Sequence, residues 1–188
     1  MRQMVRNQLH ALKQRTQIDP DVETRKQEII TTFDRQIKMI DAELEQWITK
    51  SEWAKQGAYL KSVKVIGIIS ASWLLVITNG FTTCEDAQQL ASYLGLVPHP
   101  NHSGTSRHGY KPTSLHGHAR ARRVLYQASV SAASYNPVIK RFYQRLISSG
   151  KHVKVARVAA TRKLVHLAFA VATKKKPFDP DYQLQKIA

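Results

Sequence analysis

A narrow apolar stripe runs along the chain between Ile30 and Trp47. Its members follow one another in steps of three and four, and charged residues of both signs flank them. That spacing is typical of a coiled-coil helix, which buries one seam and exposes its other faces. It predicts a long helix from about Asp21 to Lys50. The seam consists of Ile30, Phe33, Ile37, Ile40, Leu44 and Trp47.

A lone helix cannot bury such a seam, so a second helix must cover it. The first 17 residues offer one candidate, because Val5, Leu9 and Leu12 recur there at helical spacing. Asp19-Pro20 separates the two segments, since the residue before a proline disfavours helix. Residues 1–52 are therefore expected to form a helical hairpin within one protomer or a coiled coil between two chains. The spacing leaves both open, including a homo-oligomer.

The remainder of the chain also has helical patterning, without a strand pattern of any weight. Apolar residues dominate 59–78, where a helix is predicted to end at Asn79-Gly80, and Thr83 is predicted to cap the helix that follows. The expected fold class is mainly α, with an N-terminal helical hairpin or coiled coil followed by a compact helical domain. Three further helices are predicted over 118–134, 137–148 and 152–173.

Two features indicate a cytoplasmic protein without a membrane partner. The most apolar run, Val65 to Thr78, is shorter than the roughly 20 residues that a membrane-spanning helix needs, so it predicts a buried core helix. The single cysteine, Cys84, excludes an internal disulfide and a multi-cysteine zinc site, and it suits a reducing cytosol.

The charge distribution is one-sided. No Asp or Glu occurs between Ala87 and Phe178, although this window holds 16 of the 29 Lys and Arg residues. A surface without carboxylates suits a polyanion such as DNA or RNA, because no negative side chain repels phosphate. The same window cannot build a two-metal nuclease site, whose cations need acidic ligands.

The irregular segment from His99 to Gly117 is the first candidate for chemistry. Ser103 lies there with Arg107 and Lys111 close by in sequence. A serine hydroxyl among guanidinium groups can attack phosphorus while the cations stabilise the equatorial oxygens. Ser-Gly pairs are also ordinary turn residues, so the pattern alone leaves a structural role open. The segment's four histidines, and His118 directly after it, have no Cys or carboxylate beside them, so no metal site is expected.

The predicted helices after residue 118 are rich in cations. Because no acid compensates them, they predict a phosphate-binding surface rather than a merely solvated face. The aromatic residues Tyr126, Tyr135, Phe142, Tyr143 and Phe169 are predicted to be core. The candidate nucleic-acid-binding residues are Arg107, Lys111, Arg120, Arg122, Arg123, Lys140, Arg141, Arg145, Lys151, Lys154, Arg157, Arg162 and Lys163.

Long segments of the chain resemble the C-terminal half of the insertion-sequence transposases of the IS110 family. These are DEDD transposases, with a RuvC-like domain first and a helical transposase domain last. The resemblance is carried by NQLHALKQR (7–15), FTTCEDAQQLASYLGLVP (81–98), HSGTSRHG (102–109) and the stretches 116–151 and 154–182.

The resemblance implies DNA recombination guided by a structured bridge RNA, in an oligomer whose active site combines two domains. It implies RuvC-type acidic residues with Mg²⁺ and a nucleophilic serine from the transposase domain. The family's serine matches Ser103, with Ser106 as the second choice. The resemblance divides the chain into a helical linker (1–52), a transposase domain (53–182) and a tail (183–188).

The chain departs from the family's pattern in two places. Where the family has a turn like Gly-Ile-Gly-Pro-x-Thr-Ala, similar to a helix-hairpin-helix DNA binder, residues 65–71 read Val-Ile-Gly-Ile-Ile-Ser-Ala. A packing role is therefore expected for this degenerate turn within 63–80. The RuvC-like residues are also missing, so this chain is expected to hold no cofactor itself, and Mg²⁺ is expected in the missing domain.

Together these features predict DNA transposition or recombination. The transposase domain would bind DNA and a guide RNA and supply Ser103 for strand transfer, and it would be inactive without a RuvC-like partner domain. The alternative is a non-catalytic nucleic-acid-binding module or a degenerate transposase remnant.

Overall fold

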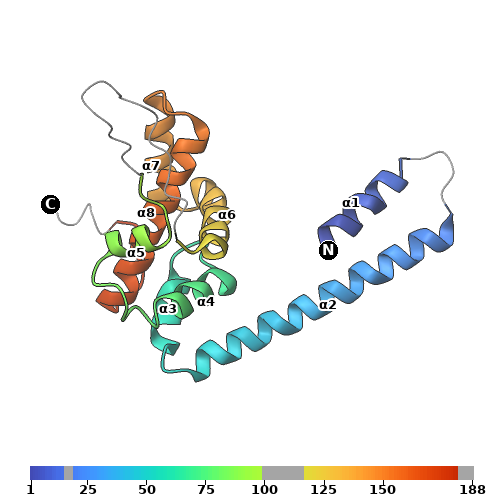
Figure 1. The fold of residues 1–188 in the computed structure, drawn as a ribbon, viewed down its shortest axis with the longest axis horizontal. Coiled ribbons are helices and arrows are strands. Elements are labelled where there is room, and N and C mark those ends of the chain that lie inside the picture. Colours follow the sequence, from blue (N-terminus) through green and yellow to red (C-terminus); the bar gives the residue numbers. More distant parts are fainter. Residues whose placement is uncertain (15–18, 99–116, 182–188) are drawn as a thin grey trace. The chain divides into compact units, whose positions relative to one another are not determined.

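The computed structural model describes residues 1–14, 19–98 and 117–181. Over these residues the chain forms eight helices and no strand, which confirms the mainly α fold class (Figure 1). It divides into two compact units, Met1–Trp47 and Ile48–Ala188. No helix in the described ranges is both long and apolar enough to cross a bilayer.

The first unit is a helical hairpin. Helix α1 (Arg2–Leu12) runs antiparallel to α2 (Pro20–Lys50), as the partners of their polar contacts show. Asp34 pairs with Arg2 and, at 3.1 Å, with Arg6, whereas Lys13 near the other end of α1 pairs with Glu23 at 2.8 Å. These contacts lie at the surface, where an ion pair contributes little to stability.

Apolar burial therefore holds the hairpin together. Leu9 of α1 is 8% exposed and Ile30 of the predicted seam is 4% exposed. Farther along α2, Ile37 and Ile40 are 36% and 55% exposed. The hairpin within one protomer is thus present, and α1 covers the first part of the seam. Pairing of the remainder with a second chain stays a prediction.

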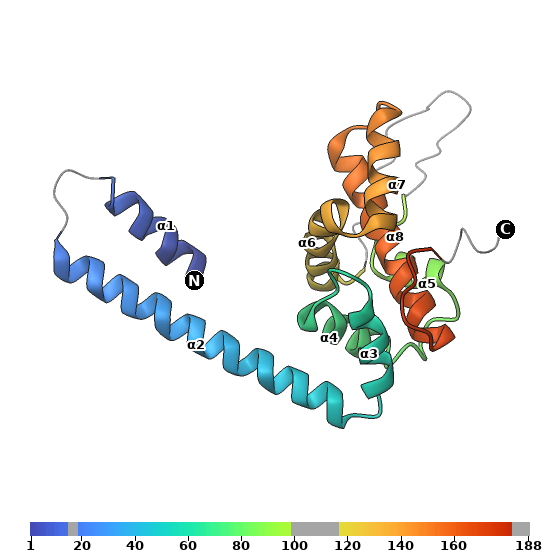
Figure 2. The same ribbon diagram turned by 180° about the vertical axis from the view of Figure 1, so that it is seen from behind.

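The second unit is organised around its last helix. α8 (Val153–Lys174) packs against α3 (Ala54–Ser62), α5 (Ala87–Tyr93), α6 (Ala119–Tyr135) and α7 (Pro137–Ser148), while α4 (Ile68–Ile77) packs on α3 and α6. α6, α7 and α8 lie side by side in the view of Figure 1 and from behind in Figure 2. Small residues on α8, among them Ala156, Ala160 and Ala168, are fully buried, which lets its neighbours approach closely.

The apolar stretch 59–78 is not one continuous helix, because the chain turns between α3 and α4, within the range 63–80 where a degenerate turn was expected. Val65 has a φ of 86°, a left-handed conformation that no helix continues through, and α4 begins only after Gly67. Val63 and Ile66 are buried, so the turn packs into the core.

The capping residue predicted from the sequence was wrong for α5 and right for α7. Thr83 does not cap α5; Asp86 does, and its carboxylate accepts from the backbone N–H groups of Gln88 and Gln89 at 2.7 Å each. Asn136 caps α7, with Pro137 in the first turn as expected. Both Thr83 and Asp86 are acceptable caps in sequence, and only the position of Ala87 as the first helical residue distinguishes them.

Candidate nucleic-acid interface

The described residues on either side of the segment that carries the candidate serine lie near the end of α5. Residues 99–116, and with them Ser103, Ser106, Arg107 and Lys111, lie outside the described residues. Pro98 follows closely on α5, and on the other side the backbone N–H of His118 donates to the carbonyl of Tyr93 at 3.2 Å. The two ends of the segment are therefore held near the carboxyl end of one short helix.

Gly117 makes this close approach feasible. Its φ is 113°, and a Cβ atom built on it would lie 2.5 Å from the Tyr93 carbonyl oxygen and 2.8 Å from the Gly95 nitrogen. Both contacts are with backbone, which cannot turn away as a side chain can. A side chain at position 117 would therefore push the start of α6 off α5.

Arg122 contributes to the same junction. Its Nη1 donates to the carbonyl of Leu94 at 2.9 Å, so this guanidinium ties α6 to the end of α5. Arg120 and Arg123, its neighbours on α6, are exposed. Three arginines at the start of α6 were predicted to bind nucleic acid. Arg120 and Arg123 are exposed to solvent, whereas Arg122 makes a structural contact with α5.

An aromatic cluster lies beside this junction. The His118 ring meets Trp73 of α4 edge-on, with 5.5 Å between ring centroids, and Tyr93 of α5 at 6.5 Å. Tyr93 is 49% exposed. The start of α6 therefore lies beside an aromatic cluster that includes an exposed tyrosine, and α6 presents the exposed Arg120 and Arg123.

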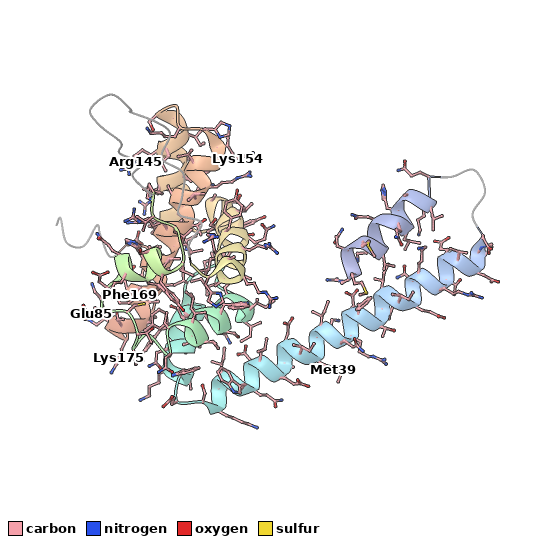
Figure 3. All side chains as sticks on the ribbon, in the orientation of Figure 1. Met39, Glu85, Arg145, Lys154, Phe169 and Lys175 are labelled. Atoms are coloured by element: carbon pink, nitrogen blue, oxygen red, sulfur yellow. The ribbon has the colours of Figure 1, made fainter. Side chains whose placement is uncertain are left out.

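The largest group of exposed cations lies on α7 and the amino-terminal part of α8. Arg141 donates from Nε to the Pro137 carbonyl at 3.3 Å, and the Arg145 guanidinium lies over the Phe142 ring at 5.4 Å. Figure 3 shows Arg145 and Lys154 near the end of the unit where α7 turns into α8. The exposed members of this group are Lys140, Arg141, Arg145, Lys151 and Lys154.

Three further predicted residues on α8 are half-buried: Arg157, Arg162 and Lys163. The phenol of Tyr126 and, to a smaller extent, that of Tyr143 raise the pKa of Arg157, while burial acts in the opposite direction. Both tyrosines were predicted to be core, and this influence on Arg157 was not predicted. Tyr135, also predicted to be core, is 66% exposed, because it ends α6 beyond the packed region.

Arg162 and Lys163 border the one histidine with a displaced pKa among the described residues. Burial lowers the pKa of His166, and the positive charges of Arg162 and Lys163 lower it further, whereas Asp86 acts weakly in the other direction. Within the described residues, the Nε2 atom of His166 is buried and has no hydrogen-bond partner. The neutral imidazole is therefore the favoured form at this site.

The described part of the chain contains no group of three or more His, Cys, Asp or Glu side chains that could hold a metal ion. Of the five histidines predicted around the irregular segment, His118 is described, and its ring packs between aromatic residues. The other four lie outside the described ranges: His99, His102, His108 and His116.

These features define a class: a helical domain whose helices α6, α7 and α8 carry cations and no carboxylate, and whose start of α6 is bonded to the end of α5. The sequence model of the family described as Transposase IS116/IS110/IS902 matches residues 57–144, from α3 into α7. By this match, residues 57–144 are a transposase domain of this family.

Its relatives include two proteins named pilin gene-inverting protein. The one from Moraxella lacunata is 31% identical over 126 residues, which is 66% of this chain and 39% of the relative. The one from Moraxella bovis is 30% identical over 146 residues, 76% of this chain and 45% of the relative. An uncharacterized insertion element IS110 protein of Streptomyces coelicolor is 30% identical over 113 residues, 60% of this chain and 27% of the relative. The chain thus spans less than half the length of these relatives.

Proposed function

We propose that this chain is the helical domain of a DNA transposase or recombinase, which grips DNA and contributes the serine for strand transfer. One observation carries the proposal: in a member of a transposase family, the cationic surface of α6, α7 and α8 has no carboxylate in its own sequence. In the sequence, the segment containing Ser103 directly precedes the start of α6, which is bonded to the end of α5. The names of the two Moraxella relatives, which describe inversion of a gene, agree with a recombination reaction.

In the proposed reaction, the Ser103 hydroxyl attacks a DNA phosphorus atom. A bond forms between the serine oxygen and phosphorus, the bond from phosphorus to one deoxyribose oxygen breaks, and the serine proton passes to a base while the released sugar oxygen takes up a proton. The number of phosphoester bonds stays constant, so a second sugar hydroxyl can reverse the step. The exposed arginines of α6 would stabilise charge on the phosphate.

The described residues do not fit a Mg²⁺ site, since they offer no cluster of hard carboxylate ligands and α6, α7 and α8 carry no acid. We therefore assign the acidic metal ligands to a separate RuvC-like domain. It follows that the chain by itself would bind nucleic acid without cutting it.

Two partners belong to the same proposal. A guide RNA would bind the same carboxylate-free surface as DNA, because both nucleic acids present phosphate groups. A second copy of the chain would pair along the exposed part of the α2 seam, where Ile37 and Ile40 lie at heptad spacing.

The test is formation of a covalent protein–DNA link. The chain would be mixed with labelled DNA and with the part of the Moraxella bovis relative that it does not match, and the products would be separated on a denaturing gel. We expect a slowly migrating adduct that Ser103→Ala abolishes and the matched variant Ser106→Ala retains. If Ser103→Ala keeps the adduct while Ser106→Ala loses it, Ser106 is the nucleophile.

A second candidate function is a non-catalytic nucleic-acid-binding module. The observation that favours it is the lack of acidic ligands among the described residues, which leaves binding intact and removes metal chemistry. This candidate predicts steeply salt-dependent binding that Ser103→Ala does not change. Absence of an adduct under every complementation, together with such binding, would decide for it.

A further inference from the structure

The turn between α7 and α8 projects from the packed part of the second unit. Residues 151–155 are exposed without interruption, and Ala156 is the first buried residue of α8. A helix that lies against a neighbour buries one residue in every three or four, so this exposed run means that no described helix covers any side of the first turn of α8. Residues 147–150, on the α7 side, are exposed in the same way. We call residues 147–155 the hairpin tip.

Hydrogen bonds within the chain fix the backbone of the hairpin tip. Gly150 has a φ of 77° and donates from its N–H to the Ile147 carbonyl at 2.9 Å, and the next N–H along the chain donates to the Leu146 carbonyl at 3.0 Å. This pair of bonds is the Schellman arrangement that ends a helix. On the α8 side, Nδ1 of His152 accepts from the Lys154 N–H at 3.2 Å. The hairpin tip is therefore a tight turn whose backbone needs no support from another element.

The hairpin tip exposes aliphatic side chains. Ile147, Val153 and Val155 are 37%, 43% and 44% exposed, although side chains of this kind are usually buried. A single exposed aliphatic residue is common on a protein surface, but three of them at one projecting turn form a group. Covering such a group with apolar surface is favourable, so the group indicates a contact site.

Charge determines which kind of partner fits this contact site. Arg145, Lys151 and Lys154 are exposed in or beside the hairpin tip, and α7 and α8 contain no Asp or Glu. The Arg145 guanidinium lies 5.4 Å from the centroid of the Phe142 ring, and Figure 3 shows Arg145 and Lys154 at this end of the unit. Aliphatic side chains among uncompensated cations are complementary to a polyanion that also offers apolar surface. In a nucleic acid the phosphates supply the negative charge and the stacked bases supply the apolar surface.

We propose that the hairpin tip is a wedge that enters a groove of DNA and partly unstacks two neighbouring base pairs. The cations contact phosphates beside the groove, while an aliphatic side chain, of which Ile147 is the largest, presses between the bases. Wedges of this kind kink a duplex, most easily at flexible pyrimidine–purine steps. The inference deepens the proposed function and rests on it, because that function makes DNA the bound polyanion.

The test uses the full chain and a short DNA duplex in which 2-aminopurine replaces the adenine of a central TA step. The fluorescence of 2-aminopurine rises when the base loses its stacking. The triple variant Ile147→Thr, Val153→Thr, Val155→Thr keeps the charge and keeps every residue β-branched, but it makes the hairpin tip polar. We expect the parent to raise the fluorescence. The triple variant should abolish the rise and weaken binding about tenfold at unchanged salt slope, since phosphate contacts alone set that slope.

Two further variants are matched to this one. Ile69 and Val76 on α4 are 46% and 57% exposed, but their helix carries no Lys or Arg, so the double variant Ile69→Thr, Val76→Thr should change neither fluorescence nor affinity. The double variant Lys151→Gln, Lys154→Gln should lower the magnitude of the salt slope by up to about 1.8 and keep the fluorescence rise at saturating protein. Each variant is measured below its own unfolding transition, so that lost stability is not scored as lost affinity.

The possible failures are distinguishable. If the parent binds DNA steeply with salt but leaves 2-aminopurine stacked, or if the triple variant keeps the fluorescence rise, the wedge is wrong and the proposed function stands. The wedge is also wrong if the triple variant keeps its DNA affinity but loses binding to vesicles of anionic phospholipid, because the hairpin tip would then contact a membrane. Loss of co-elution with the unmatched part of the Moraxella bovis relative, at unchanged DNA affinity, would instead make the hairpin tip a contact between domains. If the parent shows no salt-dependent DNA binding, the proposed function itself fails.

Discussion

Asn136 shows how one buried polar side chain can join three elements. It is fully buried between α6 and α7, and its Oδ1 accepts from the backbone N–H groups of Val138 and Ile139 at 3.1 and 3.2 Å. Its Nδ2 donates to the carbonyl of Lys64, in the turn between α3 and α4, at 3.3 Å. The amide thus caps one helix and satisfies the backbone of a distant turn.

Replacing Asn136 should cost more than an ordinary cap. Asn136→Ala removes the cap, worth about 1 kcal/mol, and leaves the Lys64 carbonyl without its donor, so we expect a loss of about 2–3 kcal/mol in the free energy of unfolding. Urea denaturation measures this loss. Ser134→Ala, an exposed change two residues earlier on α6, is the control and should leave the midpoint nearly unchanged.

The lowered pKa of His166 makes stability depend on pH. In the folded state the imidazole binds a proton less readily than in the unfolded state, so its contribution is complete above the ordinary histidine pKa of about 6.5 and is lost as pH falls below it. Unfolding free energies at about pH 7.5 and about pH 5.5 should therefore differ more in the parent than in His166→Gln. An equal pH dependence in the two proteins would contradict the assignment.

At the scale of elements, the junction of α5 with α6 is sensitive to a single substitution. Gly117 lets the α6 backbone touch the carboxyl end of α5, and Arg122 and the His118 N–H hold the two together. In the sequence, the segment that carries Ser103 connects these two helices.

Gly117 and Gly150 allow the cost of backbone strain to be separated from the cost of a steric clash. Gly117 and Gly150 both have positive φ, at 113° and 77°, but a Cβ on Gly150 would meet nothing within 4 Å. Gly150→Ala should cost only the backbone strain, about 1 kcal/mol, whereas Gly117→Ala adds a clash with backbone and should cost clearly more. Thermal unfolding of the two variants measures the difference. Equal losses would show that α5 and α6 do not touch at Gly117.

At the scale of the whole molecule, charge is distributed by region. The formal net charge is +16, yet the acid-free stretch alone holds 16 of the 29 basic residues, and the hairpin of α1 and α2 mixes both signs. Net charge alone would attract DNA to any face, whereas a local surface would bind it through α6, α7 and α8.

Removing three positive charges from α7 or from α2 distinguishes binding by a local surface from attraction by net charge. The triple variant Lys140→Gln, Arg141→Gln, Arg145→Gln should reduce the salt slope of DNA binding by up to about 2.7, which corresponds to three lost phosphate contacts. The matched triple Arg25→Gln, Arg35→Gln, Lys38→Gln removes the same charge from exposed positions of α2 and should leave the slope nearly unchanged. Equal slopes in the two triples would favour net charge over a local surface.

Local patterns predicted a large part of this molecule. The seam from Ile30 and the punctuation at Pro20, Pro137 and Gly150 predicted α1, α2, α6, α7 and α8 within a few residues, because periodicity and capping act over one or two turns. The turn between α3 and α4 was expected only through the family resemblance, which placed a degenerate turn within 63–80. The contact that holds this turn was not predictable, because it comes from Asn136, which lies far away in the sequence.

The carboxylate-free stretch and the family resemblance were likewise evident from the sequence, since composition and motifs need no coordinates. Contacts between residues far apart in the sequence could not be predicted from it. Three contacts depend on which helix faces pack together: α1 covers part of the seam of its own chain, Arg122 binds the end of α5, and Ser129 of α6 meets Thr161 of α8. A helix's own residues define its apolar and charged faces, but the side chains that meet those faces are set by packing, which only the tertiary structure decides.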